Sequence, residues 1–158
     1  MKRLYKIFIF ISIFLGLSLY LIFSEYHVAN NEVKFLYCLD GDSAVFELNG
    51  KETEVRLLAI DCPEINDPCG MKARDFCKEI LDSAGEIELV RDEGSDDEDK
   101  YERELYWVIT DGELLQLKLV KEGLAKVDYI YGDYRYTDEL KKAENEARNN
   151  KLGIWSLQ

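Results

Sequence analysis

Residues 43–64 read SAVFELNGKETEVRLLAIDCPE, and the pattern of apolar residues and turn signals along them is typical of a β-hairpin. Residues 43–48 and 52–60 predict two strands, the second because apolar side chains recur at every second position. The dipeptide Asn49-Gly50 lies between them and favours a two-residue turn, since both positions tolerate a positive φ. We expect the second strand to end at residues 61–64 (DCPE), where a loop begins.

The same analysis, extended outward, predicts a small mixed domain. Further strands are expected at 33–39, 85–91 and 103–110, and helices at 71–83, 114–122 and 137–150. Residues 92–100 form an acidic stretch, which we expect to be a solvated, mobile loop. Five short strands, with one helix between the third and the fourth, match a five-stranded Greek-key barrel of the OB type. The predicted fold class is therefore α+β, mainly β, with about three helices.

The charge of the chain limits its partners. The chain has 158 residues, a length that suits one folded domain. Residues 1–24 hold three of its 20 basic residues and none of its 32 acidic residues, so the remainder carries a formal charge of −15. Such a charge argues against a protein that holds nucleic acid by charge alone, because those proteins neutralise phosphates with Lys and Arg. It does not exclude an enzyme that meets phosphate through a bound cation.

The N-terminal segment predicts export or membrane anchoring. Lys2, Arg3 and Lys6 are followed by the uncharged residues 7–24, which as a helix would reach roughly 27 Å. We interpret residues 1–24 as an uncleaved signal-anchor helix or a cleaved signal peptide, with a buried core helix as the third alternative.

Residues 25–32 then form a linker, and residues 33–158 form the folded domain. Either of the first two interpretations places this domain outside the cytoplasm, anchored to the membrane or secreted.

Four cysteines outside the cytoplasm are plausible disulfide partners, and Cys38, Cys62, Cys69 and Cys77 allow three complete pairings. If Cys69 and Cys77 both lie on the predicted helix, about 12 Å of helical rise separates them, too far for a bridge. Cys62 and Cys69 would close a short loop and remain possible. A metal site built from cysteines is weakly supported, because the chain has no CxxC pair and His27 lies in the linker.

Four motifs and a C-terminal stretch follow one another along the domain: Asp40-Gly41-Asp42-Ser43; Arg56 followed by Asp61-Cys62-Pro63-Glu64; residues 99–103 (DKYER); and residues 119–127 (LVKEGLAKV) followed by Tyr129 and Tyr131, before residues 151–156 (KLGIWS). This ordered set resembles the staphylococcal nuclease (thermonuclease) family. The resemblance covers about residues 33–156. Each piece alone could be a turn, an ion pair or edge packing, but their joint order makes chance improbable.

The resemblance implies a cation site. Asp42 and Asp61 look like the two carboxylate ligands of a Ca²⁺, with the backbone carbonyl of Cys62 as a third ligand and Asp40 as nearby charge. Hard oxygen ligands suit Ca²⁺ or Mg²⁺, and only the resemblance chooses Ca²⁺.

The resemblance also implies catalytic and substrate-binding side chains. Glu64 resembles the glutamate that positions or deprotonates the attacking water, and Arg56 and Arg103 resemble the pair that grips the phosphate. The expected contacts to a terminal phosphate and to the nucleotide are Lys100, Tyr101, Tyr129 and Tyr131.

The expected function is that of a monomeric Ca²⁺-dependent endonuclease, which cuts DNA and RNA with little sequence preference and leaves 3′-phosphate ends. Two alternatives stay open: a non-catalytic barrel that binds nucleic acid or protein at the cell surface, and an acidic adhesin or cation buffer. Four features depart from the family pattern, and the acidic net charge is the largest of them. Cys62 replaces Thr, Glu102 stands where Gly usually precedes the arginine, and the loop after Glu64 is short.

Overall fold

A computed structural model describes residues 33–157 of the chain. The expected N-terminal helix at 1–24 and the linker at 25–32 lie outside the described residues. Within residues 33–157, no helix combines the length and the apolar character needed to cross a membrane.

The first three strands form an antiparallel meander. β1 (Val33–Cys38) pairs with β2 (Ser43–Leu48), and β2 pairs with β3 (Lys51–Leu57). Asn49 and Gly50 join β2 to β3 with φ values of 52° and 78°, as the sequence predicts for a two-residue hairpin turn.

The sheet continues from β3 into the second half of the domain. β6 (Glu104–Thr110) lies parallel to β3, and β5 (Ile87–Val90) pairs antiparallel with β6. A two-residue strand, β7 (Glu113–Leu114), also pairs with β6, so the strand order is β1-β2-β3-β6-β5 with β7 beside β6. β1 and β5 are the ends of this hydrogen-bonded path, and the mixed sheet forms a half-barrel. The predicted barrel is confirmed in this coarser form.

The prediction of one continuous strand over 52–60 is wrong. The strand breaks after Leu57, and Ala59 takes a φ of 60°, which turns the chain out of the sheet. The chain then forms β4 (Ile60–Asp61), which pairs with β8 (Lys126–Val127) instead of with a sheet neighbour. Because β8 is so distant in sequence, the apolar pattern of residues 52–60 could not predict this pairing.

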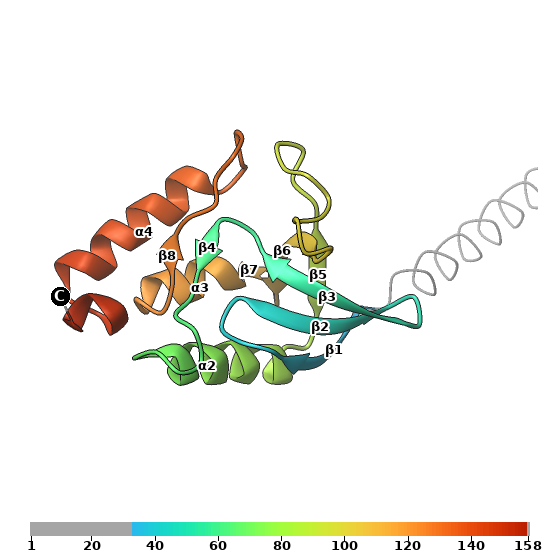
Figure 1. The fold of residues 1–158 in the computed structure, drawn as a ribbon, viewed down its shortest axis with the longest axis horizontal. Coiled ribbons are helices and arrows are strands. Elements are labelled where there is room, and N and C mark those ends of the chain that lie inside the picture. Colours follow the sequence, from blue (N-terminus) through green and yellow to red (C-terminus); the bar gives the residue numbers. More distant parts are fainter. Residues whose placement is uncertain (1–32, 158) are drawn as a thin grey trace, which may run out of the picture. The chain divides into compact units, whose positions relative to one another are not determined.

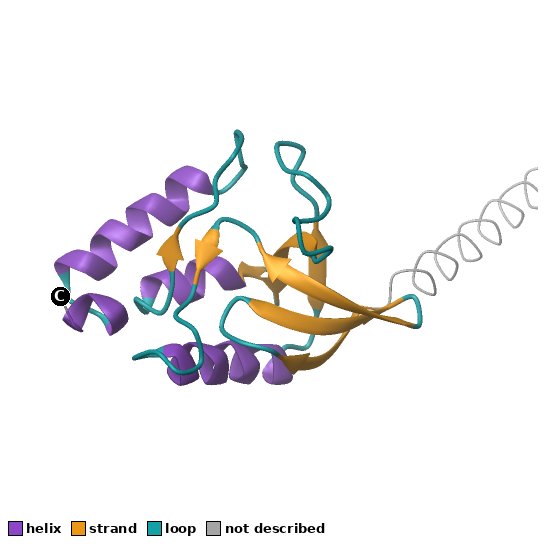
Figure 2. Ribbon diagram, viewed as in Figure 1, coloured by secondary structure: helices purple, strands orange, loops and turns teal. Residues whose placement is uncertain are grey.

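Three α-helices complete the domain, as expected: α2 (Gly70–Ser83), α3 (Leu115–Lys121) and α4 (Thr137–Asn149). A short 3₁₀ helix, η1 (Gly153–Leu157), follows α4. Acidic residues in the first turn of α4 and Arg148 in its last turn complement the helix dipole. Figure 1 shows α2 along β1 and α4 beside β8, and Figure 2 shows the same domain with its helices and strands distinguished. These helices and strands enclose one hydrophobic core. Its largest buried side chains include Phe46, Ile60, Trp107, Leu115 and Leu119.

Two loops project from the same side of the domain (Figure 1). One joins β5 to β6 (residues 91–103) and the other joins β8 to α4 (residues 128–136), and Asp92 links them. Asp92 is only 6% exposed, although the sequence predicts a solvated loop there. Its Oδ2 accepts hydrogen bonds from Trp107 Nε1 at 2.7 Å and from the backbone N–H of Arg135 at 2.9 Å, and its Oδ1 accepts one from Gly94 N–H at 2.9 Å. Burial alone would raise the pKa of Asp92, but these three donors outweigh it and lower the pKa. Asp92 thus holds the start of the acidic loop against the core.

Candidate active site

The side chains predicted from the sequence meet at one open cleft with a volume of about 750 Å³. It lies beside the ends of β2, β3 and β4 and is flanked by the two projecting loops. Ten predicted residues line it: Asp42, Arg56, Asp61, Cys62, Glu64, Lys100, Tyr101, Arg103, Tyr129 and Tyr131.

The turn before β2 is held by Asp40 and by close packing at Gly41. Asp40 Oδ1 accepts a hydrogen bond from the backbone N–H of Asp42 at 2.9 Å, the pattern of an Asx turn. A Cβ at Gly41 would lie 2.7 Å from Ala73 Cβ and 2.8 Å from Cys62 Sγ, so only glycine fits. The Asp40-Gly41 pair therefore fixes the position from which Asp42 enters the cleft.

Asp42 is a buried carboxylate, 5% exposed. Its Oδ2 accepts a hydrogen bond from the backbone N–H of Cys62 at 2.5 Å, and its Oδ1 forms an ion pair with Arg56 Nη1. Burial is the main cause that raises the pKa of Asp42, to about 6, and Arg56 opposes it. A further positive charge at this point would favour the ionised carboxylate.

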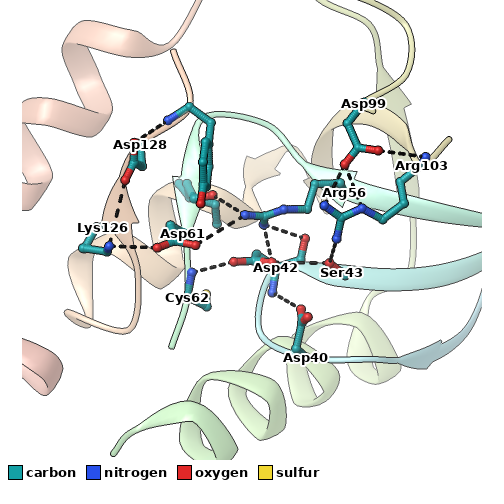
Figure 3. A network of polar contacts seen from close by, with 12 residues as sticks. Asp40, Asp42, Ser43, Arg56, Asp61, Cys62, Asp99, Arg103, Lys126 and Asp128 are labelled. Atoms are coloured by element: carbon teal, nitrogen blue, oxygen red, sulfur yellow. Dashed lines mark hydrogen bonds and ion pairs between the residues drawn. The ribbon is translucent and has the colours of Figure 1, made fainter. Parts of the chain in front are cut away.

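Arg56 lies between the two predicted ligand carboxylates (Figure 3). Its Nη2 donates to the carbonyl of Ile60 at 3.0 Å and lies 3.7 Å from Asp61 Oδ1, and its Nη1 donates to the carbonyl of Asp42 at 3.2 Å. These carbonyls come from the turn before β2 and from β4, which follows the break after β3. The break thus brings Asp42 and Asp61 to the same guanidinium group.

Asp61 has a second cationic partner, which sequence reasoning missed. Lys126 Nζ lies 2.8 Å from Asp61 Oδ2, because the antiparallel pairing of β4 with β8 places the two residues opposite each other. The hydrogen bond to Asp61 is the main cause that raises the pKa of Lys126. Lys126 stands in the GLAKV motif, but only the strand pairing connects it to the carboxylates.

The donor set fits a hard cation, although the described residues do not contain three or more His, Cys, Asp or Glu side chains grouped tightly enough to hold a metal ion. Asp42 and Asp61 both present oxygens to Arg56, and carboxylate oxygens with carbonyls and waters are what Ca²⁺ and Mg²⁺ bind. The Cys62 thiol is buried, which raises its pKa well above the ordinary value, and it packs against Gly41. Hard cations such as Ca²⁺ and Mg²⁺ prefer oxygen to sulfur, so the backbone carbonyl of Cys62 suits them better than its thiol.

Arg103 is oriented by Asp99 and Ser43. Asp99 Oδ2 lies 2.8 Å from Arg103 Nε and 2.6 Å from its Nη2, and Asp99 Oδ1 accepts the backbone N–H groups of Tyr101 and Arg103 at 2.9 and 3.1 Å. Arg103 Nη1 donates to Ser43 Oγ at 3.3 Å. Sequence reasoning assigned no role to Asp99 or Ser43, although both belong to the quoted motifs.

Glu102, the departure beside Arg103, adopts a φ of 64°. This is the left-handed conformation in which a side chain is strained and glycine is not. Residue 102 therefore has a backbone conformation that glycine would adopt without strain, which agrees with the glycine usual at this place in the family.

Glu64 and the tyrosines form the outer part of the cleft. The Glu64 side chain is exposed and has no ion pair among the residues that the structure covers. Tyr101, Tyr129 and Tyr131 are exposed, Tyr131 to 84%. Lys100 Nζ lies 4.8 Å from the centroid of the Tyr101 ring, and the Arg56 guanidinium carbon lies 5.7 Å from that of Tyr129. Exposed aromatic faces beside cations can stack on bases next to a bound phosphate.

Comparison with known proteins gives concordant matches. Residues 54–157 match the family model described as "Staphylococcal nuclease homologue". The chain is 42% identical over 125 residues to the SPbeta prophage-derived endonuclease YokF of Bacillus subtilis (strain 168), a match that covers 75% of this chain and 42% of that protein. It is 41% identical over 125 residues to endonuclease YncB of the same strain, which covers 75% of this chain and 58% of that protein. It is also 31% identical over 129 residues to a thermonuclease of Staphylococcus hyicus, which covers 78% of this chain and 75% of that protein. The chain thus spans about half the length of the two Bacillus relatives.

Proposed function

Because this chain belongs to the staphylococcal nuclease family, we propose that it is a cation-dependent endonuclease that hydrolyses DNA and RNA with little sequence preference. The observation that carries the proposal is the one cleft in which the carboxylates of Asp42 and Asp61, two guanidinium groups and Glu64, which forms no ion pair with a described residue, come together. Phosphodiester hydrolysis needs these three kinds of group, for cation binding, charge stabilisation and proton transfer.

The cation is proposed to be Ca²⁺, with Mg²⁺ as the alternative. Asp42, Asp61 and the backbone carbonyl of Cys62 are the residues that would hold it. When bound, it supplies positive charge that offsets the charge of the phosphate and polarises its oxygens.

We assign the remaining steps of hydrolysis to three side chains of the cleft. Glu64 accepts a proton from the water that attacks phosphorus, for which its exposed, unpaired carboxylate is suited. Arg56 and Arg103 stabilise the charge on the phosphoryl oxygens, because a guanidinium stays charged and offers paired donors. The water oxygen bonds to phosphorus as the P–O5′ bond breaks, the 5′ oxygen takes a proton from solvent and leaves as a hydroxyl group, and the new end carries a 3′-phosphate.

Substrate binding is proposed to depend on the rim of the cleft. Lys100 and Tyr101 contact a terminal phosphate, and Tyr129 and Tyr131 line the nucleotide. The domain acts as a monomer. A charge of −15 outside residues 1–24 repels a polyanion, so affinity for long DNA should be low and strongly dependent on divalent cation.

We also propose an extracytoplasmic location, either membrane-anchored through residues 1–24 or secreted. The support is the basic start of the sequence followed by an uncharged apolar stretch. Fractionation of cells that express the full-length chain, with N-terminal sequencing of the product, distinguishes an anchored form from a cleaved one.

Activity is tested with the full-length chain and single-stranded DNA in Ca²⁺, in Mg²⁺ and in EDTA. The Glu64→Gln variant runs beside it, and Glu79→Gln, an exposed glutamate of α2 away from the cleft, is the matched control. We expect degradation in Ca²⁺ that is absent in EDTA, a rate at least about 100-fold lower in Glu64→Gln, and no change in Glu79→Gln. Intact DNA in every reaction would overturn the proposal and favour a non-catalytic binding module.

A further inference from the structure

Two cysteines that are far apart in sequence meet inside the domain. Cys38 ends β1 and Cys77 lies in the middle of α2, 39 residues later, yet their Sγ atoms are 3.7 Å apart. Cys77 is fully buried and Cys38 is half-buried. Because α2 packs along β1, this contact is part of the core and not a surface encounter.

We propose that Cys38 and Cys77 are a disulfide site, which closes when the domain folds in an oxidising compartment. An S–S bond is about 2.05 Å long, so the two sulfurs need to approach by less than about 2 Å. Side-chain rotation at the half-buried Cys38 can supply much of that movement.

The other cysteines have different surroundings. The Cys62 sulfur faces the Asp40-Gly41 turn, where a Cβ on Gly41 would lie 2.8 Å from it. Cys69 precedes the first turn of α2 and has a φ of 70°. Of the three complete pairings open from the sequence, the contact therefore favours the one that joins Cys38 to Cys77.

The chemistry requires an oxidant, which we take to be a protein or small-molecule disulfide. The Cys38 thiolate attacks one sulfur of the oxidant, and one thiol of the oxidant leaves. The Cys77 sulfur then attacks Cys38 in the mixed disulfide, its proton passes to solvent, and the second thiol leaves. Two protein thiols lose two electrons and the oxidant disulfide gains them.

Cys38 is the better first nucleophile of the two. The hydrogen bond that Cys77 shares with Cys38, together with burial, raises the pKa of the Cys77 thiol well above its ordinary value. Cys77 is also inaccessible to an external disulfide, whereas Cys38 is partly exposed. Cys77 is therefore the resolving thiol.

The cross-link would brace the turn that carries Asp42. Cys38 lies two residues before Asp40, and Cys77 lies one helical turn after Ala73, which contacts Gly41. The turn is therefore held by the end of β1 on one side and by α2 on the other, and the disulfide would join these two elements covalently.

The first test maps the bond in the full-length chain, purified in mild detergent and equilibrated with oxidised and reduced glutathione. Trypsin separates Cys38 (residues 35–51) from Cys77 (75–78), and both from Cys62 and Cys69, which share residues 57–72. We expect peptide 35–51 joined to 75–78. Free, alkylated Cys38 and Cys77, or either peptide joined to 57–72, would overturn the proposal.

The second test measures thermal unfolding in oxidising and in reducing buffer. A disulfide of this span should raise the Tm by about 8 °C or more. The rise should disappear in Cys38→Ser and persist in Cys69→Ser, and a rise that survives in Cys38→Ser would contradict the assignment. Neither test measures nuclease activity, so both can be interpreted even if the proposed nuclease function proves wrong.

Discussion

Asp99 binds the guanidinium group of Arg103 through one carboxylate oxygen, with Oδ2 at 2.8 Å from Nε and at 2.6 Å from Nη2. The other oxygen accepts two backbone N–H groups of the same loop. Burial alone would raise the pKa of Asp99, but the Arg103 side chain and these backbone donors lower it. We therefore expect Asp99 to be a positioning residue that acts through Arg103.

Replacement of Asp99 should therefore weaken catalysis without removing a group that touches substrate. In Asp99→Ala, Arg103 keeps its charge but loses its orientation, and we expect kcat/KM to fall about 10- to 100-fold, mostly in kcat. Steady-state kinetics on single-stranded DNA measures the split. Asp97→Ala, an exposed carboxylate of the same loop, should stay near wild type. Equal losses in both variants would mean that loop charge, and not Arg103 orientation, is responsible.

Glu102 combines a strained backbone with an unfavourable charge, and two substitutions separate these effects. Glu102→Gly should relieve the φ of 64° and raise the free energy of unfolding by about 1 kcal/mol, whereas Glu102→Gln should leave it unchanged. Both variants should lower KM for DNA, because both remove negative charge beside Arg103. Urea unfolding and steady-state kinetics provide the two measurements. A Glu102→Gly protein no more stable than wild type would argue against strain.

We expect Lys126 to compete with a divalent cation for Asp61, because the two side chains form an ion pair. In Lys126→Gln, the ion pair at 2.8 Å is lost, and we expect Ca²⁺ to bind about two- to fivefold more tightly. Isothermal titration calorimetry in the absence of DNA measures the change. Lys121→Gln, an exposed lysine at the end of α3, is the matched control. Weaker Ca²⁺ binding in Lys126→Gln would show that the lysine supports the cation site and does not compete with it.

Asp42 makes the stability of the cation-free protein depend on pH. Its pKa is about 6 in the folded protein and about 3.8 in the unfolded chain, so the folded state binds the proton more tightly. Stability from this group is therefore present below about pH 4 and is lost as the pH rises to about 6, by roughly 3 kcal/mol.

Urea unfolding in EDTA between pH 4 and 7 measures how the free energy of unfolding depends on pH. The Asp42→Asn variant should lack the part of this dependence that comes from Asp42, while other groups still titrate. Ca²⁺ should restore the stability of wild type above pH 6, since it favours the ionised carboxylate. The idea fails if wild type and Asp42→Asn show the same pH dependence in EDTA.

Local sequence patterns predicted most of the elements. The Asn49-Gly50 turn, the strand before it and the three helices depend on spacing between neighbours, and the structure confirms them. The strand after the turn is confirmed only as far as Leu57. The predicted site residues also converge on one cleft, because they stand near the ends of strands or in the loops beside them.

The failures have one physical cause. The strand expected over 52–60 breaks at Ala59 because Ile60 and Asp61 pair with β8, and the loop residue Asp92 is buried because Trp107 and Arg135 supply donors to it. Both outcomes depend on partners far along the chain, which no local pattern reports.

The sequence by itself determined which chemical groups this protein carries and in which order: the two aspartates of the predicted cation site, two arginines, a glutamate and four cysteines in an acidic domain. Only the tertiary structure decided which groups meet. It pairs Lys126 with Asp61, Asp99 with Arg103 and Cys38 with Cys77. Charge interactions, hydrogen bonds and disulfides act over a few ångströms, and those distances between remote residues exist only once the chain has folded.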